Sequence, residues 1–247
     1  MEDEQPLVDF DHPELVLRPP IAPFADLLPI IRQQVQEQKR AGNPTIASIW
    51  ICMSLSQKSR VSAMRTFRRW LTRKIAGPFD HIEVLVVLSN GHCRPYTVDQ
   101  YDPHPRKRGS GFVRRPVIDP TEAYSPARWV TCQLASFDEY EAAGISYFLE
   151  RQLGKPMNST AMYWNFILPF CIGMPLEYEQ DSYFCSHLVA AALKWVRPDQ
   201  FDDLNPLKCT PHKLYRLLRQ GGDIDHPTRP HETQMVVWRK LDDSATF

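Results

Sequence analysis

One stretch of the sequence, Asp181-Ser-Tyr-Phe-Cys-Ser-His-Leu-Val-Ala-Ala-Ala-Leu193, predicts a helix with a cysteine at its start. Ala and Leu are strong helix formers. Apolar side chains recur at helical spacing: Leu188, Ala191, Ala192 and Trp195. Asp181 or Ser182 is predicted to cap the N-terminus, which places Cys185 in or near the first turn. The unpaired N–H groups and the dipole of that turn favour negative charge, so a thiol there becomes a better nucleophile.

A partner for this thiol is predicted on a strand upstream. The residues 78–88, Pro-Phe-Asp-His-Ile-Glu-Val-Leu-Val-Val-Leu, have the composition of a buried strand that carries His81 near its start. Asn90-Gly91 predicts a two-residue hairpin turn in which Ser89 pairs with His92. Stepping outward then places His81 opposite Gln100, and a register slip of one residue would select Asp99 instead. A thiolate needs a base and the base needs a third group to orient it, so Asp99 and Gln100 are both candidates.

Four segments together resemble circularly permuted NlpC/P60 proteins, the YiiX-like branch of papain-like thiol enzymes. Tyr-Phe-Cys-Ser-His-Leu-Val-Ala-Ala-Ala-Leu resembles the family's "YxCSELVxxAL" helix, with His187 where bacterial members usually have Glu. Phe-Asp-His-Ile-Glu-Val resembles the "fsHvei" strand, Gly154-Lys-Pro resembles a "GkpYn" segment, and Thr210-Pro-His-Lys-Leu resembles "TPxdL". The resemblance implies an α+β, permuted papain-like fold, in which an antiparallel, barrel-like sheet packs on the helix of Cys185.

The resemblance also implies roles for individual residues. Cys185 would be the nucleophile and His81 the base, and Asp99 matches the family's third, acidic position best. We expect the backbone N–H of Cys185 to bind the oxyanion, with Tyr183 and Ser186 as further oxyanion or substrate-side candidates. Because the family contains peptidases, amidases and lipid acyl enzymes, the fold alone does not choose the substrate. The predicted function is a cysteine-dependent peptidase or amidase. The alternatives are a lipid acyltransferase or phospholipase of the same fold, and a non-catalytic binding module.

Length and composition limit the function classes. The 247 residues are interpreted as an extended, proline-rich arm over residues 1–22 and one domain over residues 23–247. Lys plus Arg and Asp plus Glu number 29 each, which gives no indication of nucleic-acid binding. The six Cys show no CxxC pair or metal spacing, so we predict free thiols, no metal and no cofactor. The acidic N-terminus and the lack of an apolar run of about 20 residues predict a soluble, intracellular protein without a transmembrane segment.

The remaining elements are predicted from periodicity and caps. Helices are expected over residues 23–40, 56–75, 136–153 and 210–218, strands over 45–53, 128–134 and 234–240, a loop over 101–120, and an apolar core segment over 162–170. Ser136 and Glu139 form a predicted capping box, and Thr210-Pro211 a predicted helix start. The helix over 56–75 has a basic face, interpreted as either a solvated surface or an anionic contact: Arg65, Arg68, Arg69 and Arg73.

Overall fold

The structure, a computed structural model, describes residues 21–55, 78–99, 112–114, 124, 128–157 and 182–224. The elements in chain order are α1 (Phe24–Arg40), β1 (Ile46–Leu55), β2 (Phe79–Leu88), β3 (Cys93–Asp99), β4 (Phe112–Arg114), β5 (Trp129–Gln133), α4 (Glu139–Gln152), α6 (Cys185–Val196), the short 3-10 helix η2 (Pro206–Lys208) and α7 (Pro211–Gln220). The predicted helices near residues 23–40, 136–153, 185–196 and 210–218 are therefore all present, as are the strands near 45–53 and 128–134.

The strands form a five-stranded sheet in the order β4-β3-β2-β1-β5, and every neighbouring pair is antiparallel. The α+β class and an antiparallel sheet packed on the helix of Cys185 are thus confirmed. Among the strands that the structure describes, β4 and β5 are the two edges, so the barrel-like closure that we expected is not seen among them. The expected loop over residues 101–120 contains strand β4.

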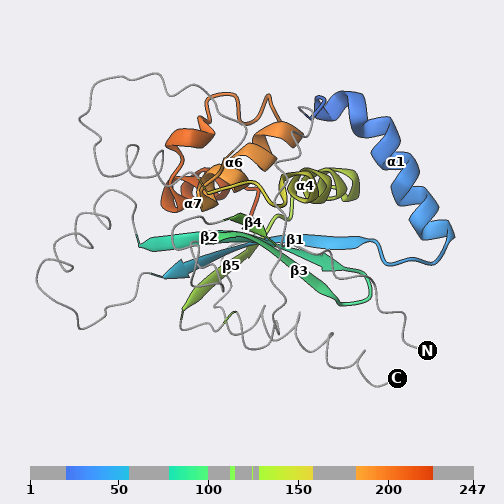
Figure 1. Cartoon of the computed structure of the whole chain (residues 1–247), viewed down its shortest axis with the longest axis horizontal. Coiled ribbons are helices and arrows are strands. Elements are labelled where there is room, and N and C mark those ends of the chain that lie inside the picture. Colours follow the sequence, from blue (N-terminus) through green and yellow to red (C-terminus); the bar gives the residue numbers. More distant parts are fainter. Residues whose placement is uncertain are drawn as a thin grey trace, which may run out of the picture.

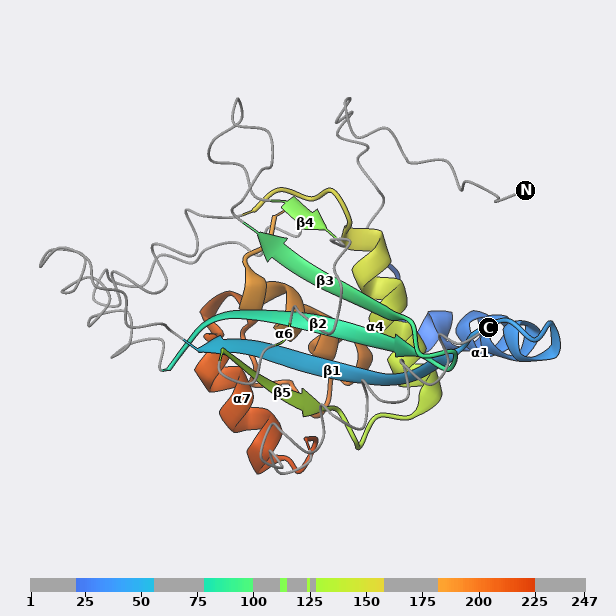
Figure 2. The ribbon, with the colours of Figure 1, turned by 90° about the horizontal axis from the view of Figure 1, so that it is seen from below.

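The helices α4, α6 and α7 lie together on one face of the sheet (Figures 1 and 2). α6 packs on β2 and β3, α4 packs on β1, and α1 packs on the outer side of α4. Alternate residues of β1 and β2, among them Ile51, Met53, Ile82 and Val84, point into this core. α6 is apolar almost all round and is buried along most of its length, because it packs on the sheet and also on α1, α4, α7 and η2.

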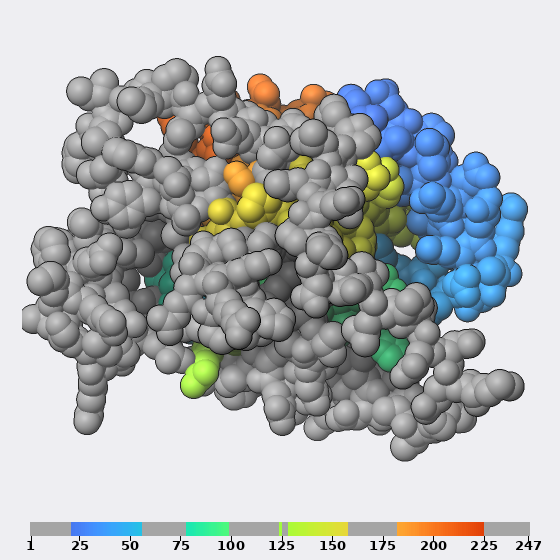
Figure 3. All heavy atoms as spheres, in the orientation of Figure 1, coloured from blue at the N-terminus to red at the C-terminus, as the bar shows by residue number. Residues whose placement is uncertain are grey.

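α1 forms a blue, exposed flank of the molecule in the space-filling view (Figure 3). It is anchored where Phe24 packs edge-on against Trp195 of α6, with ring centroids 5.2 Å apart. The same ring covers Gly144 of α4, where an added Cβ would lie only 2.4 Å from Cε2 of Phe24. The missing side chain at Gly144 therefore lets the start of α1 approach α4 closely.

The opposite face of the sheet is covered by a second, smaller apolar cluster. Its buried members are Trp50, Cys52, Leu85, Val87 and Tyr124, with Cys93 and Trp129 packed against them. The middle of β1 and β2 is consequently buried on both faces, which explains the nearly continuous apolar runs in these two strands. The polar exception is Glu83, a buried carboxyl residue in the middle of β2.

The hairpin between β2 and β3 differs from our prediction by one residue. The N–H of Leu88 donates to the carbonyl of His92 at 2.8 Å, so the loop is Ser89-Asn90-Gly91 rather than Asn90-Gly91 alone. Gly91 has a φ of 85°, which suits the left-handed position that ends such three-residue loops. The ladder pairs Val84 with Tyr96. Continuing this register places His81 opposite Asp99 instead of Gln100.

Two of the three predicted helix starts also change. The capping box of α4 is formed by Asp138 and Glu141, because Asp138 accepts the N–H of Glu141 and the Glu141 side chain accepts the N–H of Asp138; Ser136 is not the cap. The N-cap of α6 is Phe184, which provides no side-chain cap, so Asp181 and Ser182 do not fill this position. Thr210 and Pro211 begin α7 as predicted, with the Thr210 hydroxyl accepting the N–H of Lys213.

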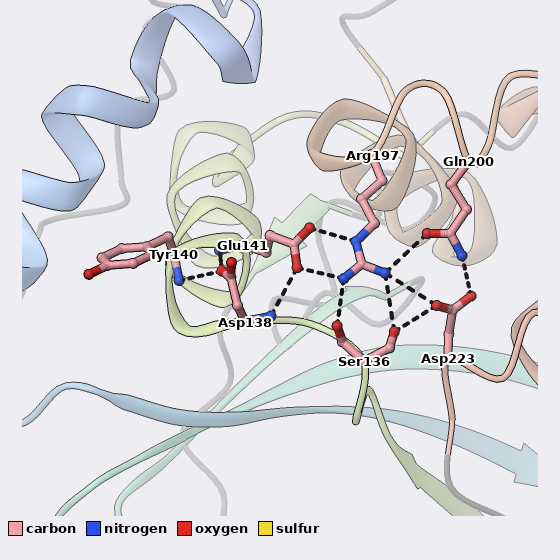
Figure 4. Close-up of polar contacts among 7 residues, drawn as sticks. All are labelled: Ser136, Asp138, Tyr140, Glu141, Arg197, Gln200 and Asp223. Atoms are coloured by element: carbon pink, nitrogen blue, oxygen red, sulfur yellow. Dashed lines mark hydrogen bonds and ion pairs between the residues drawn. The ribbon is translucent and has the colours of Figure 1, made fainter.

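Arg197, the residue after α6, joins three parts of the chain (Figure 4). Its Nε and Nη2 donate to both carboxylate oxygens of Glu141 at 2.6 Å, and Nη1 donates to Oδ1 of Asp223 at 3.3 Å. Nη2 also donates to the carbonyl of Ser136 at 2.6 Å. The guanidinium lies 3.9 Å from the ring centroid of Phe137. We call this set of contacts the Arg197 cluster; it fixes the end of α6 to the start of α4 and to the segment after α7.

Several predicted segments lie outside the described residues. They are residues 1–20 of the arm, the basic helix over 56–75 with Arg65, Arg68, Arg69 and Arg73, the apolar segment over 162–170, and the strand over 234–240.

Candidate active site

Cys185 is the first residue of α6. The preceding residue, Phe184, has φ −111° and ψ 167°, so the chain enters the helix in an extended conformation. Because Phe184 has no side-chain acceptor, it does not satisfy the N–H groups of the first turn, and the backbone N–H groups of Ser186 and of Ile82 on β2 hydrogen bond to the sulfur. The sulfur is therefore set among donors, an arrangement that stabilises a thiolate.

His81 reaches this sulfur from β2, the strand on which α6 packs. The Cys185 thiol and the His81 imidazole are close enough to act on each other's protonation. The His81 side chain is 30% exposed, so it lies at the boundary between the interior and the surface. The structure thus brings together the two residues, 104 positions apart in the chain, that the sequence suggested as nucleophile and base.

Cys185 and His81 shift each other's pKa in the directions that favour an ion pair. Burial alone would raise the pKa of the Cys185 thiol, but the hydrogen bond and charge of His81, with the N–H groups of Ile82 and Ser186, lower it overall. Burial alone would lower the pKa of His81, but the hydrogen bonds and charges of Cys185 and Glu83 raise it to about 10. Between the lowered pKa of the thiol and about pH 10, the pair is a thiolate beside an imidazolium.

The other described cysteines contrast with Cys185. Burial raises the pKa of Cys52, that of Cys93 to about 11, and those of Cys132 and Cys209 to about 12. All five described cysteines are free thiols, and Cys171 lies outside the described part of the chain. Cys185 is thus the described thiol whose surroundings favour the nucleophilic form.

The far side of the His81 ring contacts residues that the sequence analysis did not select. Nε2 lies 2.8 Å from the hydroxyl of Thr97 on β3 and 3.9 Å from a carboxylate oxygen of Glu83. These contacts occupy Nε2, which leaves Nδ1 as the ring nitrogen for Cys185. The indole of Trp129 stands edge-on to the imidazole, with centroids 6.2 Å apart. The ring is therefore held by a hydroxyl, a carboxylate and an aromatic side chain.

The two predicted orienting residues have a different outcome. Asp99 is the last residue of β3 and pairs with Phe112 of β4, and its role stays a prediction; Gln100 lies outside the described residues. Alternation along the strand was the signal for Glu83, because residues two apart share a face and Glu is out of place in an apolar run.

Ser186 and Tyr183 occupy interior positions. The Ser186 hydroxyl is fully buried and donates to the carbonyl of Cys209 at 2.6 Å, which ties α6 to the residues before α7. Tyr183 is 2% exposed, and its N–H donates to the carbonyl of Pro156 at 3.0 Å. Lys155 lies over the Tyr183 ring, 5.7 Å from the centroid. These contacts give both residues a place in the packing around the start of α6.

His187 lies on the buried side of α6. It is fully buried, with its ring 4.7 Å from that of Tyr183 and 5.2 Å from that of Phe184, measured between centroids. Burial lowers its pKa to about 4, so the ring is neutral near pH 7. His187 therefore adds no charge beside Cys185 at that pH.

A separate cavity of about 940 Å³ lies beside the start of α1, the end of α4 and the second half of α6. Phe24, Phe148, Gln152 and Trp195 are among its lining residues. Neither Cys185 nor His81 lines it, so this cavity and the Cys185–His81 pair are distinct places on the fold.

Within the described ranges, no three His, Cys, Asp or Glu side chains gather as metal ligands would. Over the same ranges, the helices fall short of the length and apolarity that crossing a bilayer requires. Comparisons of the chain with protein-family models, with curated proteins and with solved structures found no match.

Proposed function

We propose that this protein is a cysteine-dependent hydrolase in which Cys185 is the nucleophile and His81 the general base and acid. The observation that supports this most strongly is the mutual interaction of the Cys185 thiol, at the start of a buried helix, with the His81 imidazole on the strand against which that helix packs. A thiol, a base in contact with it and polar groups that orient the base are the parts of an activated nucleophile. The raised pKa of the four other described cysteines makes the lowered pKa of Cys185 specific to this position.

The proposed reaction begins with attack of the Cys185 thiolate on a carbonyl carbon. The carbonyl oxygen becomes an oxyanion that the backbone N–H of Cys185 stabilises. The His81 imidazolium then gives its proton to the leaving group, the bond from the carbonyl carbon to that group breaks, and a thioacyl-enzyme remains. Neutral His81 next takes a proton from water as the water attacks the thioester, which releases the acid and restores the thiolate and the imidazolium.

An amide or peptide bond is the proposed substrate class. A leaving amine is a poor leaving group unless it is protonated, and an imidazolium that keeps its proton to about pH 10 supplies that proton at neutral pH. An acyl ester needs this proton less, because an alkoxide leaves more readily than an amide anion.

Membership of the circularly permuted NlpC/P60 group belongs to the same proposal. It is supported by the order of the residues, with His81 on a strand upstream and Cys185 on a helix downstream, and by the antiparallel hairpin that follows His81.

The test is labelling by an electrophilic probe at neutral pH, followed by a screen of amide and ester substrates. Wild-type protein should be labelled at one site, and Cys185→Ala should lose that label while it keeps its fold. Cys93→Ala is the matched control, because Cys93 is partly exposed but has a raised pKa. Labelling that persists in Cys185→Ala, or an unreactive wild-type thiol, would exclude the proposed nucleophile and favour a binding module.

A further inference from the structure

We infer that Glu83 and Tyr124 form the support that holds His81 in its active orientation, with Tyr124 acting through Glu83. This inference rests on the proposed function, because it names the groups that position the proposed base. It differs from the sequence-based expectation, in which the third residue stands at the end of β3. Glu83 instead lies two residues beyond His81 on the same strand.

The geometry around Nε2 of His81 places Glu83 in this role. The carboxylate oxygen Oε2 lies 3.9 Å from Nε2, and the Glu83 side chain is only 9% exposed. A negative charge this close to an imidazolium favours the protonated ring, and the effect is larger where water is largely excluded. When the ring is an imidazolium, Nε2 donates to the Thr97 hydroxyl 2.8 Å away, so Thr97 sets the direction of the N–H and Glu83 supplies the charge.

Tyr124 is the second part of the support. It is 2% exposed and lies in the apolar cluster on the face of the sheet opposite the helices. Its hydroxyl interacts with the Glu83 carboxylate. Burial, together with nearby groups that include Glu83, raises the pKa of Tyr124, so the hydroxyl keeps its proton and is a donor. A buried carboxylate needs donors, and the Tyr124 hydroxyl is the one inferred for Glu83.

The ring of Tyr124 provides a second connection to His81. It stands edge-on to the ring of Trp129, with centroids 5.2 Å apart, and Trp129 stands edge-on to His81 at 6.2 Å. Tyr124 therefore braces both the carboxylate and the aromatic neighbour of the imidazole. Asp80, the residue before His81, is engaged elsewhere, in a hydrogen bond from Ser54.

The experiment measures the pKa of His81 directly, by nitrogen NMR of protein labelled in its histidines, with the signal assigned from its loss in His81→Asn. Glu83→Gln keeps the size of the side chain and removes the charge. We expect it to lower the pKa of His81 by about one unit, a tenfold change in the ratio of imidazolium to imidazole. Tyr124→Phe should give a smaller change. The double variant Glu83→Gln/Tyr124→Phe should match Glu83→Gln alone, because Tyr124 acts through Glu83.

Two controls separate this support from general packing and from the rival residue. Trp50→Phe perturbs the same apolar cluster, where Trp50 donates to Ser48, and should leave the pKa of His81 unchanged. Asp99→Asn should also leave it unchanged. A shift in Asp99→Asn with none in Glu83→Gln would overturn the inference, as would additive effects of Glu83→Gln and Tyr124→Phe.

The proposed function can fail separately. If wild-type His81 titrates near pH 6.5 and Cys185 is unreactive, the thiol mechanism fails. If wild-type His81 titrates well above this value and Glu83→Gln does not change it, the support is wrong while the mechanism stands.

Discussion

The two ends of α6 hold charged side chains in opposite ways. At its start, Cys185 and His81 form a pair whose charges exist because each group stabilises the other. At its end, Arg197 carries a permanent charge and spreads its donors over Glu141, Asp223 and the carbonyl of Ser136. The first pair is partly exposed and can exchange a proton within itself, whereas the contact with Glu141 raises the pKa of the Arg197 guanidinium, which keeps its charge. The helix therefore separates a group suited to reaction from a group suited to stability.

The largest expected effect is on the reactive end. Cys185→Ala and His81→Ala should each lower turnover by about 10³-fold or more, because nucleophile and base act as one unit. The double variant should be no worse than either single variant. Urea unfolding should show that all three proteins remain folded. Turnover within tenfold of wild type in His81→Ala would contradict the assignment of His81 as the base.

At the end of α6, substitution of Arg197 should lower the stability of the protein rather than its turnover. Arg197→Ala leaves Asp223 and Glu141 without their cation, and Asp223 is only 3% exposed at its side chain. Breaking such a pair costs about 3 kcal/mol in the free energy of unfolding. Arg197→Lys is the control, because it keeps the charge but loses the bidentate contact with Glu141. Its free energy of unfolding should lie between those of wild type and Arg197→Ala. An Arg197→Ala protein as stable as wild type would mean that the cluster contributes nothing net.

The pH dependence of turnover sharpens the comparison at the reactive end. The thiolate is lost as pH falls through the lowered pKa of Cys185, and the proton for the leaving amine is lost as pH rises through the pKa of His81, about 10. We expect amide turnover to be flat between these limits. Thr97→Val removes the acceptor at Nε2 and should lower activity across the plateau by about tenfold. A plateau that ends near pH 7 would place the pKa of His81 far below the value that this structure supports.

The sequence predicted the helix of Cys185 and the strand of His81 because apolar periodicity and turn signals are local. It left the third group open between Asp99 and Gln100, because the contacts of His81 depend on features that are not local. The Ser89-Asn90-Gly91 loop has one more residue than predicted, and continuing the ladder from Val84 and Tyr96 then places position 81 opposite position 99 rather than position 100. The contacts of Tyr124 with Glu83 and Trp129 depend on how a distant segment returns to the sheet, and no spacing in the sequence encodes that return. Among these residues, Glu83 is the one that the sequence could have indicated, because a carboxyl residue within an apolar strand is unusual.

Ser186 gives the smallest expected effect, and it tests whether closeness to Cys185 in the chain implies a part in the reaction. Its hydroxyl is buried and donates to the carbonyl of Cys209 at 2.6 Å, so Ser186→Ala leaves a buried acceptor without this donor. The expected loss is about 1 kcal/mol in the free energy of unfolding, measured by urea denaturation. Turnover should stay within about threefold of wild type, because the backbone N–H of Ser186 still reaches the sulfur. Ser186→Cys is the matched variant, since a thiol is a weak donor of similar size, and it should be intermediate in stability. A large loss of turnover with unchanged stability would reverse this interpretation and place the hydroxyl at the substrate.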